Sequence, residues 1–157
     1  MPVVLHRVTD SGTVTTMRSE QGVLSLFKNT QEIWLQASIA FSVTIDEVNF
    51  EAETVERIES GDLAAIYETP ECCEEALHIY FLNGIATNGI AVGRNLAVVN
   101  DITTVNDFRA TAHEIGHLLG LGHTLESRER LMFQGVNGER LSRFEIETAR
   151  GNALRIF

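Results

Sequence analysis

Long apolar runs and basic side chains are both scarce in this sequence of 157 residues. No stretch approaches the roughly eighteen apolar residues of a transmembrane helix, so the sequence predicts no membrane span. Only Lys28 is a lysine among twelve basic side chains, which oppose twenty-two acidic ones to give a net charge of −10. This balance lacks the positive patch that nucleic-acid binding requires, and it also disfavours anionic membrane surfaces. We therefore expect neither nucleic acid nor a bilayer among the partners.

Cysteine is equally scarce, and its only two copies, Cys72 and Cys73, are adjacent. Neighbouring cysteines cannot link distant elements, which excludes a disulfide framework. We expect two ordinary thiols, with a strained bridge between them as the less favoured alternative. The opening MPVVLHRVTDSG has no cationic start followed by an apolar run, so it is not a signal peptide. The chain is then either cytosolic or the product of a precursor that has lost its leader.

The remaining composition is that of one globular domain spanning residues 1–157. Apolar residues make up 44% of the chain and charged residues 22%, a balance typical of folded domains. Because apolar positions recur about every 3.6 residues in helices and every second residue in strands, their period predicts the elements. We expect strands at 2–8, 39–45, 77–82, 90–92 and 96–99, and helices at 23–37, 107–119 and 143–154. This order predicts an α+β fold, with the 90–92 strand at a sheet edge.

Capping residues mark the last two helices. Asp107 is a candidate N-cap for the first of them, and Gly120 is suited to end it. Ser142 and Glu145 form an S-x-x-E capping box at the start of the second.

Acidic residues concentrate between positions 46 and 75, where eleven of the twenty-two occur beside a single arginine, Arg57. Such a run could attract a cation or a basic substrate. Charge runs more often form solvated surface, so we expect loops and short elements facing water.

The segment HEIGHLLGLGH at residues 113–123 carries the most specific chemical signal. On a helix, His113 and His117 lie one turn apart on the same face and can bind one zinc ion. Gly120 can adopt a left-handed conformation that turns the chain and returns His123 to the same ion. Glu114 lies at the edge of that face, within reach of a water that the metal activates, as a general base requires. Three nitrogen ligands with one open position describe a catalytic zinc site.

The other two histidines, His6 and His78, fall in predicted strands without a neighbouring ligand pattern. We expect both to have structural roles.

The extended motif resembles the signature of the metzincin clan of zinc endopeptidases, H-E-x-x-H-x-x-G-x-x-H followed by a Met-turn. Met132 and its neighbours are similar to the matrixin Met-turn, in which the methionine packs beneath the zinc ligands without taking part in the chemistry. The resemblance implies a twisted mixed five-stranded sheet with a backing helix, an active-site helix and a C-terminal helix. It also implies an upper subdomain of about residues 1–122 and a lower one of about 123–157.

The resemblance further implies that an extended substrate pairs antiparallel with an edge strand. Our candidate for this strand is formed by Gly89, Ile90, Ala91 and Val92.

Several features depart from the clan. Residues 83–100 contain no histidine or aspartate, so we do not expect the additional structural zinc and calcium of matrixins. We expect one catalytic Zn²⁺ ion. Gln134 stands two residues after Met132, where some members carry a zinc-binding tyrosine. The sequence also lacks the paired C-x-x-C of the archaeal branch, and the segment around Cys72 is a poor match to a cysteine-switch propeptide.

These features predict a monomeric zinc-dependent endopeptidase that hydrolyses internal bonds of proteins or peptides, with Glu114 as general base. One alternative is a non-catalytic, zinc-stabilised module that binds a peptide intact. Another is a peptidase restricted to a single substrate. The resemblance favours a secreted or extracytoplasmic protein, while the sequence itself leaves a cytoplasmic one open.

Overall fold

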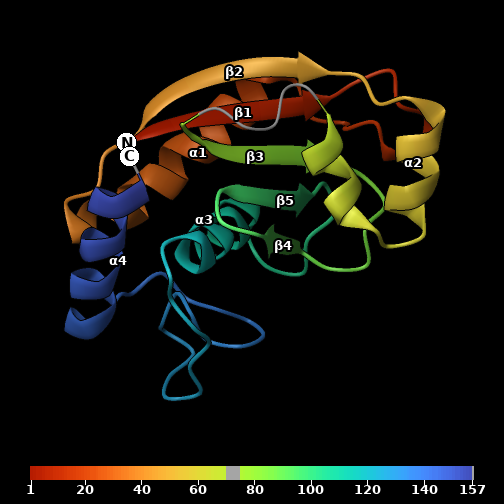
Figure 1. The fold of residues 1–157 in the computed structure, drawn as a ribbon. Helices are drawn as coiled ribbons and strands as arrows, with labels where there is room; N and C mark the ends of the chain where they lie inside the picture. Colours follow the sequence, from red (N-terminus) through yellow and green to blue (C-terminus); the bar gives the residue numbers. More distant parts are fainter. Residues whose placement is uncertain (70–74, 157) are drawn as a thin grey trace.

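A computed structural model describes residues 1–69 and 75–156, apart from the side chain of Ile156. Figure 1 shows the path of the chain. The strands are β1 (Pro2–Val8), β2 (Ser42–Val48), β3 (Leu77–Leu82), β4 (Gly89–Val92) and β5 (Leu96–Asn100). The helices are α1 (Glu20–Trp34), α2 (Ala52–Glu59), α3 (Asp107–Leu118) and α4 (Arg143–Ile156), with 3₁₀ turns η1 (Gly12–Val14), η2 (Leu35–Ala37) and η3 (Leu63–Glu68). Cys72 and Cys73, with the expectation of ordinary thiols, lie outside the described residues.

The strands form a single mixed sheet of five, in the order β2-β1-β3-β5-β4. Four strands run parallel, and only β4 is antiparallel to its neighbour β5. The prediction of a short edge strand near residue 90 is therefore confirmed. No helix within residues 1–69 and 75–156 is both long enough and apolar enough to cross a bilayer.

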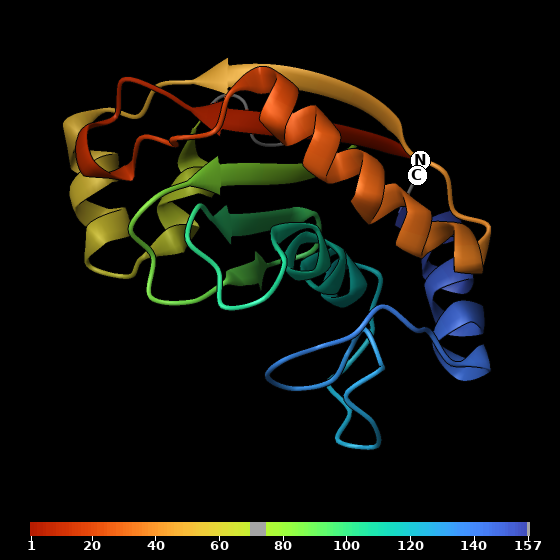
Figure 2. The same ribbon diagram turned by 180° about the vertical axis from the view of Figure 1, so that it is seen from behind.

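Each face of the sheet is covered by its own layer. Ile79 and Phe81 of β3 pack in the core that α1 and α3 cover, and Figure 2 shows these two helices on the same side of the sheet. Tyr80 and Leu82 point the opposite way, into a second core with α2 and η3. All six residues of β3 are buried, as a central strand enclosed on both faces requires. The layer that contains α3 determines where the candidate site lies.

The strand predicted at 39–45 forms three residues later than expected, as β2. Ser38 adopts a left-handed conformation (φ 52°), and the Ile39 N–H donates to the Trp34 carbonyl oxygen at 3.2 Å. Ile39 therefore belongs to the end of the preceding helix, and Phe41 packs edge-on against Phe27 of that helix at 5.5 Å between ring centroids. Their apolar character serves helix packing, which is why alternation alone misplaced the strand.

The acidic run is more ordered than predicted, because residues 52–59 form the helix α2. Ile58 is its one buried residue, and this is too little apolar periodicity to reveal a helix from sequence. Arg57 pairs with Asp62 and Glu68 across the turn that follows. The glutamates of α2 are exposed, in keeping with the solvated surface that we expected.

His6 and His78 form a buried pair on neighbouring strands. His6 Nε2 lies 2.9 Å from His78 Nδ1, and the His6 ring stacks on Tyr80 at 4.2 Å between centroids. Burial, reinforced by the charge of His78, lowers the pKa of His6 from 6.5 to about 3. His6 is thus neutral in the folded protein at pH 7, and the buried pair is part of the core.

This burial predicts a loss of stability in acid. The pKa of His6 is lower in the folded state than the 6.5 of the unfolded state. Its contribution to the free energy of unfolding is therefore complete above pH 6.5 and is lost as the pH falls toward 3. Relative to His6→Phe, we expect the wild-type free energy of unfolding to fall by about 1 kcal/mol per pH unit between pH 6 and 4. Urea unfolding of both proteins measures the difference, and parallel pH curves for the two would contradict it.

Candidate metal centre

The helix α3 carries His113, Glu114 and His117, and it begins at Asp107 as predicted, with its N-cap one residue before. Asn106 occupies the N-cap position, without a side-chain capping bond. Asp107 lies inside the first turn and pairs with Arg18 at 2.6 Å, so its predicted role as the N-cap is wrong. The reason is tertiary, since Arg18 approaches from the loop that connects β1 to α1. This ion pair connects the start of α3 to the loop that precedes α1.

Gly120 ends the helix as predicted. It has a φ of +79°, and the Leu121 N–H donates back to the Gly116 carbonyl oxygen at 2.9 Å. A Cβ atom at Gly120 would also collide with the amide nitrogen of Asn152, which donates to the Leu119 carbonyl oxygen at 2.9 Å. Backbone conformation and packing against α4 therefore both require glycine here. The turn reverses the chain and brings His123 back toward the helix.

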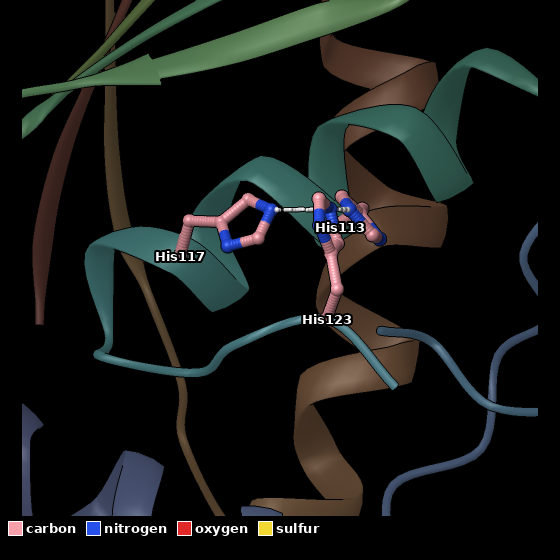
Figure 3. A group of neighbouring side chains, drawn as sticks. All are labelled: His113, His117 and His123. Carbon is pink, nitrogen blue, oxygen red and sulfur yellow. Dashed lines mark hydrogen bonds between the residues drawn. The ribbon is translucent and has the colours of Figure 1, made fainter. Parts of the chain in front are cut away.

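Three imidazole nitrogens converge where this turn meets α3. The Nε2 atoms of His113, His117 and His123 lie 3.1 to 3.2 Å apart, and Figure 3 shows the rings directed toward one another. Within residues 1–69 and 75–156, these three histidines form a cluster of side chains that could hold a metal ion. Tetrahedral zinc at about 2.0–2.1 Å from each nitrogen needs the nitrogens about 3.3 Å apart. The triangle therefore fits a zinc ion with little adjustment.

The outer nitrogens of two rings establish why this cluster needs a cation. His113 Nδ1 lies 2.7 Å from the Leu131 carbonyl oxygen, and His117 Nδ1 lies 2.9 Å from that of Leu121. A carbonyl oxygen only accepts, so both Nδ1 atoms carry the proton and both Nε2 atoms present lone pairs. Two lone pairs at 3.2 Å repel each other. A metal ion removes that repulsion, and the carbonyls orient the rings as outer partners of metal ligands do.

Burial keeps these ligands uncharged. It lowers the pKa of His113 to about 4 and lowers the pKa of His117 in the same direction. Neutral imidazole is the form that binds metal, so the two helix ligands are ready to bind at neutral pH.

Glu114 lies beside the cluster, enclosed between α3 and β4. Its exposed fraction is 7%, and burial raises its pKa to about 7, against an opposing hydrogen bond from the Ala91 backbone. A Cβ atom at Gly89 would lie 2.8 Å from Glu114 Cγ. Glycine at this position therefore makes room for the carboxylate. A buried carboxyl group with a raised pKa can exchange a proton near neutrality.

Met132 is fully buried beneath the site helix. A Cβ atom at Gly116, between the two helix histidines, would collide with its sulfur. The Met132 carbonyl oxygen accepts from the Thr124 N–H at 2.8 Å, which fastens this segment to the chain just after His123. The structure thus places Met132 against the ligand-bearing turn of α3.

The strand β4 presents an open edge above the cluster. Asn100 N–H donates to the Asn88 carbonyl oxygen at 2.9 Å. In an antiparallel ladder every second residue pair is hydrogen-bonded, so this bond shows which residues of β4 bond to β5. Ile90 and Val92 therefore direct their backbone groups toward β5. Gly89 and Ala91 direct theirs to the open edge, where an added strand could pair.

Two hollows adjoin the histidine cluster under this edge. One, of about 290 Å³, lies toward the start of β4 and is bounded by Gly89 and the loop around Asn137. The other, of about 430 Å³, lies toward the end of β4, at Gly93. Glu114 and His123 line both. An extended chain crossing the site could therefore place residues on both sides of Glu114.

Sequence reasoning missed the groups that orient the cluster. The Leu131 and Leu121 carbonyls are backbone atoms, which leave no signature in side-chain chemistry. Arg18 is distant in sequence from α3, and nothing in its local pattern sets it apart. Gly116 and Gly89 did carry a signal, because a glycine inside a helix or strand indicates a close approach.

The fold and this site together define the chain as a mixed α/β protein with a three-histidine metal-site candidate at its third helix and the turn that follows it. No family model matches the sequence, and neither does any curated protein. Among solved structures, the chain is similar to archaemetzincin from Methanopyrus kandleri, with a TM-score of 0.67 and 16% sequence identity. The match covers 99% of this chain and 96% of that one. At this identity the likeness establishes the fold, which extends over almost all of both chains.

The converging lone pairs predict that metal-free protein binds one Zn²⁺ per chain. Replacing His123 by alanine should weaken binding by about a hundredfold or more, because one of three ligands is lost. Saturating zinc should raise the free energy of unfolding by about 3 kcal/mol at a hundred times the Kd. Titration against a chromophoric chelator measures stoichiometry and affinity. The control is His6→Phe, which should bind zinc like the wild type, and equal affinity for His123→Ala would contradict the site.

The contact between Gly116 and Met132 predicts that Gly116→Ala is destabilising. Alanine normally stabilises a helix interior relative to glycine by about 1 kcal/mol. Here the new methyl group meets a fully buried methionine, and overpacking of this kind costs about 1–3 kcal/mol. Thermal unfolding should show a lower Tm than wild type. Gly122→Ala is the matched control, since no atom lies within 4 Å of its added Cβ, and a Tm for Gly116→Ala at or above that of wild type would refute the contact.

Proposed function

We propose that this protein is a metzincin-like zinc endopeptidase that hydrolyses internal peptide bonds. The observation that carries the proposal is the convergence of three imidazole Nε2 atoms beside a buried carboxyl group under an open strand edge. The motif at residues 113–123, with Met132 after it, resembles the metzincin signature. The similarity in fold to archaemetzincin supports the same class.

In this proposal His113, His117 and His123 hold one zinc ion. When bound, zinc supplies Lewis-acid polarisation of a carbonyl group and acidifies water at neutral pH. Glu114 takes the proton from the attacking water at its carboxylate as the water oxygen bonds to the scissile carbonyl carbon. It then delivers that proton to the amine nitrogen as the carbon–nitrogen bond breaks.

The protein or peptide substrate lies along β4 as an added antiparallel strand. Its backbone bonds to groups of Gly89 and Ala91, which accounts for binding with limited dependence on sequence. Because the pairing is antiparallel, residues before the scissile bond lie toward Val92 and residues after it lie toward Gly89. Met132 supports the ligand-bearing helix by packing against Gly116 and takes no part in bond cleavage.

Substitution of Glu114 by glutamine separates catalysis from zinc binding. Glutamine keeps the volume that Gly89 accommodates but cannot accept the proton, so we expect zinc affinity within about threefold of wild type and a loss of cleavage of at least a thousandfold. Zinc-loaded wild type and Glu114→Gln are incubated with a diverse peptide pool, and new termini are read by mass spectrometry. Internal cuts made only by the wild type support an endopeptidase.

Cleavage by Glu114→Gln at the wild-type rate would refute the role of this residue. Peptides retained intact by zinc-loaded wild type would instead identify a binding module, and this outcome would overturn the proposed activity. A peptidase with one substrate would leave the pool uncut and unbound, and incubation with a proteome extract in place of the pool would reveal its single cut.

A further inference from the structure

The 290 Å³ hollow beside Glu114 contains a nearly buried hydrogen-bonding group that no described residue uses. Most of its polar lining is committed internally. Thr87 Oγ1 donates to the Gly89 carbonyl oxygen at 3.0 Å, and the Asn88 carboxamide is bonded to Thr104 through both its nitrogen and its oxygen. These side chains shape the hollow but offer little to an occupant.

Asn137 is the exception. It lines the hollow with an exposed fraction of 4%. Its Nδ2 donates to the carbonyl oxygens of Arg109 and Gly138, at 3.3 Å each. Since both partners only accept hydrogen bonds, the amide cannot be flipped, and the position of Oδ1 is fixed as well. This orientation is therefore set by the wall of the site.

Asn137 Oδ1 receives no hydrogen bond from any residue in 1–69 or 75–156. The atom is also not fully enclosed, and its residue lines the hollow. Arg109 holds the same loop from behind, where its Nη1 donates to the Asn137 backbone oxygen at 2.8 Å. A rigid, nearly buried residue whose acceptor has no partner among the described residues thus lines the hollow.

The rest of the hollow selects by size and charge. Val105 and Ala110 contribute buried apolar surface, and the volume admits a side chain as long as glutamine. Glu114 is the acidic group on its lining, and no lysine or arginine joins it there among the described residues. A substrate carboxylate would meet both Glu114 and the Asn137 acceptor, and no lysine or arginine among the described residues lines the hollow to balance their charge and polarity.

We propose that Asn137 is a specificity-determining residue, which selects an uncharged side chain with a terminal N–H donor immediately after the scissile bond. The proposal rests on the proposed function, because antiparallel pairing with β4 is what directs that substrate residue toward Gly89. Glutamine fits the description, since its stem can lie on Val105 and Ala110 while its amide donates to Oδ1. Methionine has nearly the same shape without a donor, and glutamate has the shape with a negative charge.

The test uses three peptides that differ only in this residue, carrying glutamine, methionine or glutamate. Their binding to zinc-loaded Glu114→Gln is measured by calorimetry, and their cleavage by zinc-loaded wild type is measured in parallel. The glutamine peptide should bind about fivefold more tightly than the methionine peptide, as one added neutral hydrogen bond allows. The glutamate peptide should be cleaved least by the wild type, in which Glu114 keeps its carboxyl group. Equal or reversed affinities for glutamine and methionine, or no binding of any peptide, would overturn the assignment.

Further substitutions in the Glu114→Gln background separate recognition by Oδ1 from a purely structural role of the loop. Asn137→Leu removes both the acceptor and the Nδ2 donor, so the preference for glutamine should vanish or reverse. Asn137→Asp also removes the Nδ2 donor but keeps an acceptor, so the preference should survive. Loss of the preference in both variants would mean that Asn137 acts only by holding the loop, and would overturn the proposal.

Gln134 provides the matched control. Its side chain is exposed on the rim of the same hollow and forms no hydrogen bond with the described residues. Gln134→Leu should leave the ratio of glutamine to methionine affinity within about twofold of its parent, because a mobile surface amide contributes little. A collapse of the ratio in this variant would transfer the role to Gln134. Binding without cleavage in wild type would refute the endopeptidase while leaving the specificity of Asn137 supported.

Discussion

Three imidazole nitrogens converge on one point, where a cation would be bound favourably, and this structure depends on that constraint. His113 and His117 are each fixed by a carbonyl oxygen behind the ring, so each must turn a lone pair toward its neighbour. Without a positive charge between them, this arrangement is repulsive. The fold therefore holds a geometry that a bound metal ion would stabilise. A preformed site of this kind loses little free energy to rearrangement when the ion arrives.

Several distant parts of the chain maintain that geometry. The Leu131 carbonyl that orients His113 belongs to the segment that also buries Met132 under Gly116. Arg130, one residue earlier, pairs with Glu145 of α4 at 2.8 Å and so connects this segment to the last helix. On the other side, Arg18 connects the start of α3 to the loop before α1. Displacement of any of these segments would move a ring or the helix that carries it.

The predictions from sequence succeeded where the signal was local. The period of apolar residues located every strand of the sheet to within a few residues, and Ser142 and Glu145 form the predicted capping box at the start of α4. The period failed at Ile39 and Phe41, which pack with α1 and lie outside β2. It also gave no sign of α2, whose one buried residue is Ile58, with Val55 packing half-buried against the same core. In both cases contacts with distant residues overrode the local pattern.

The sequence by itself determined the spacing of the three histidines, the position of Glu114 one residue after the first, and the glycine that turns the chain back. These follow from helix geometry and from the backbone freedom of glycine, which are properties of a short segment. Only the tertiary structure decided which carbonyls orient the rings, that β4 encloses Glu114 against Gly89, and that Asn137 lines the hollow beside the site. Those features arise from contacts between segments far apart in the chain, and backbone groups and packing distances leave no trace in the order of side chains.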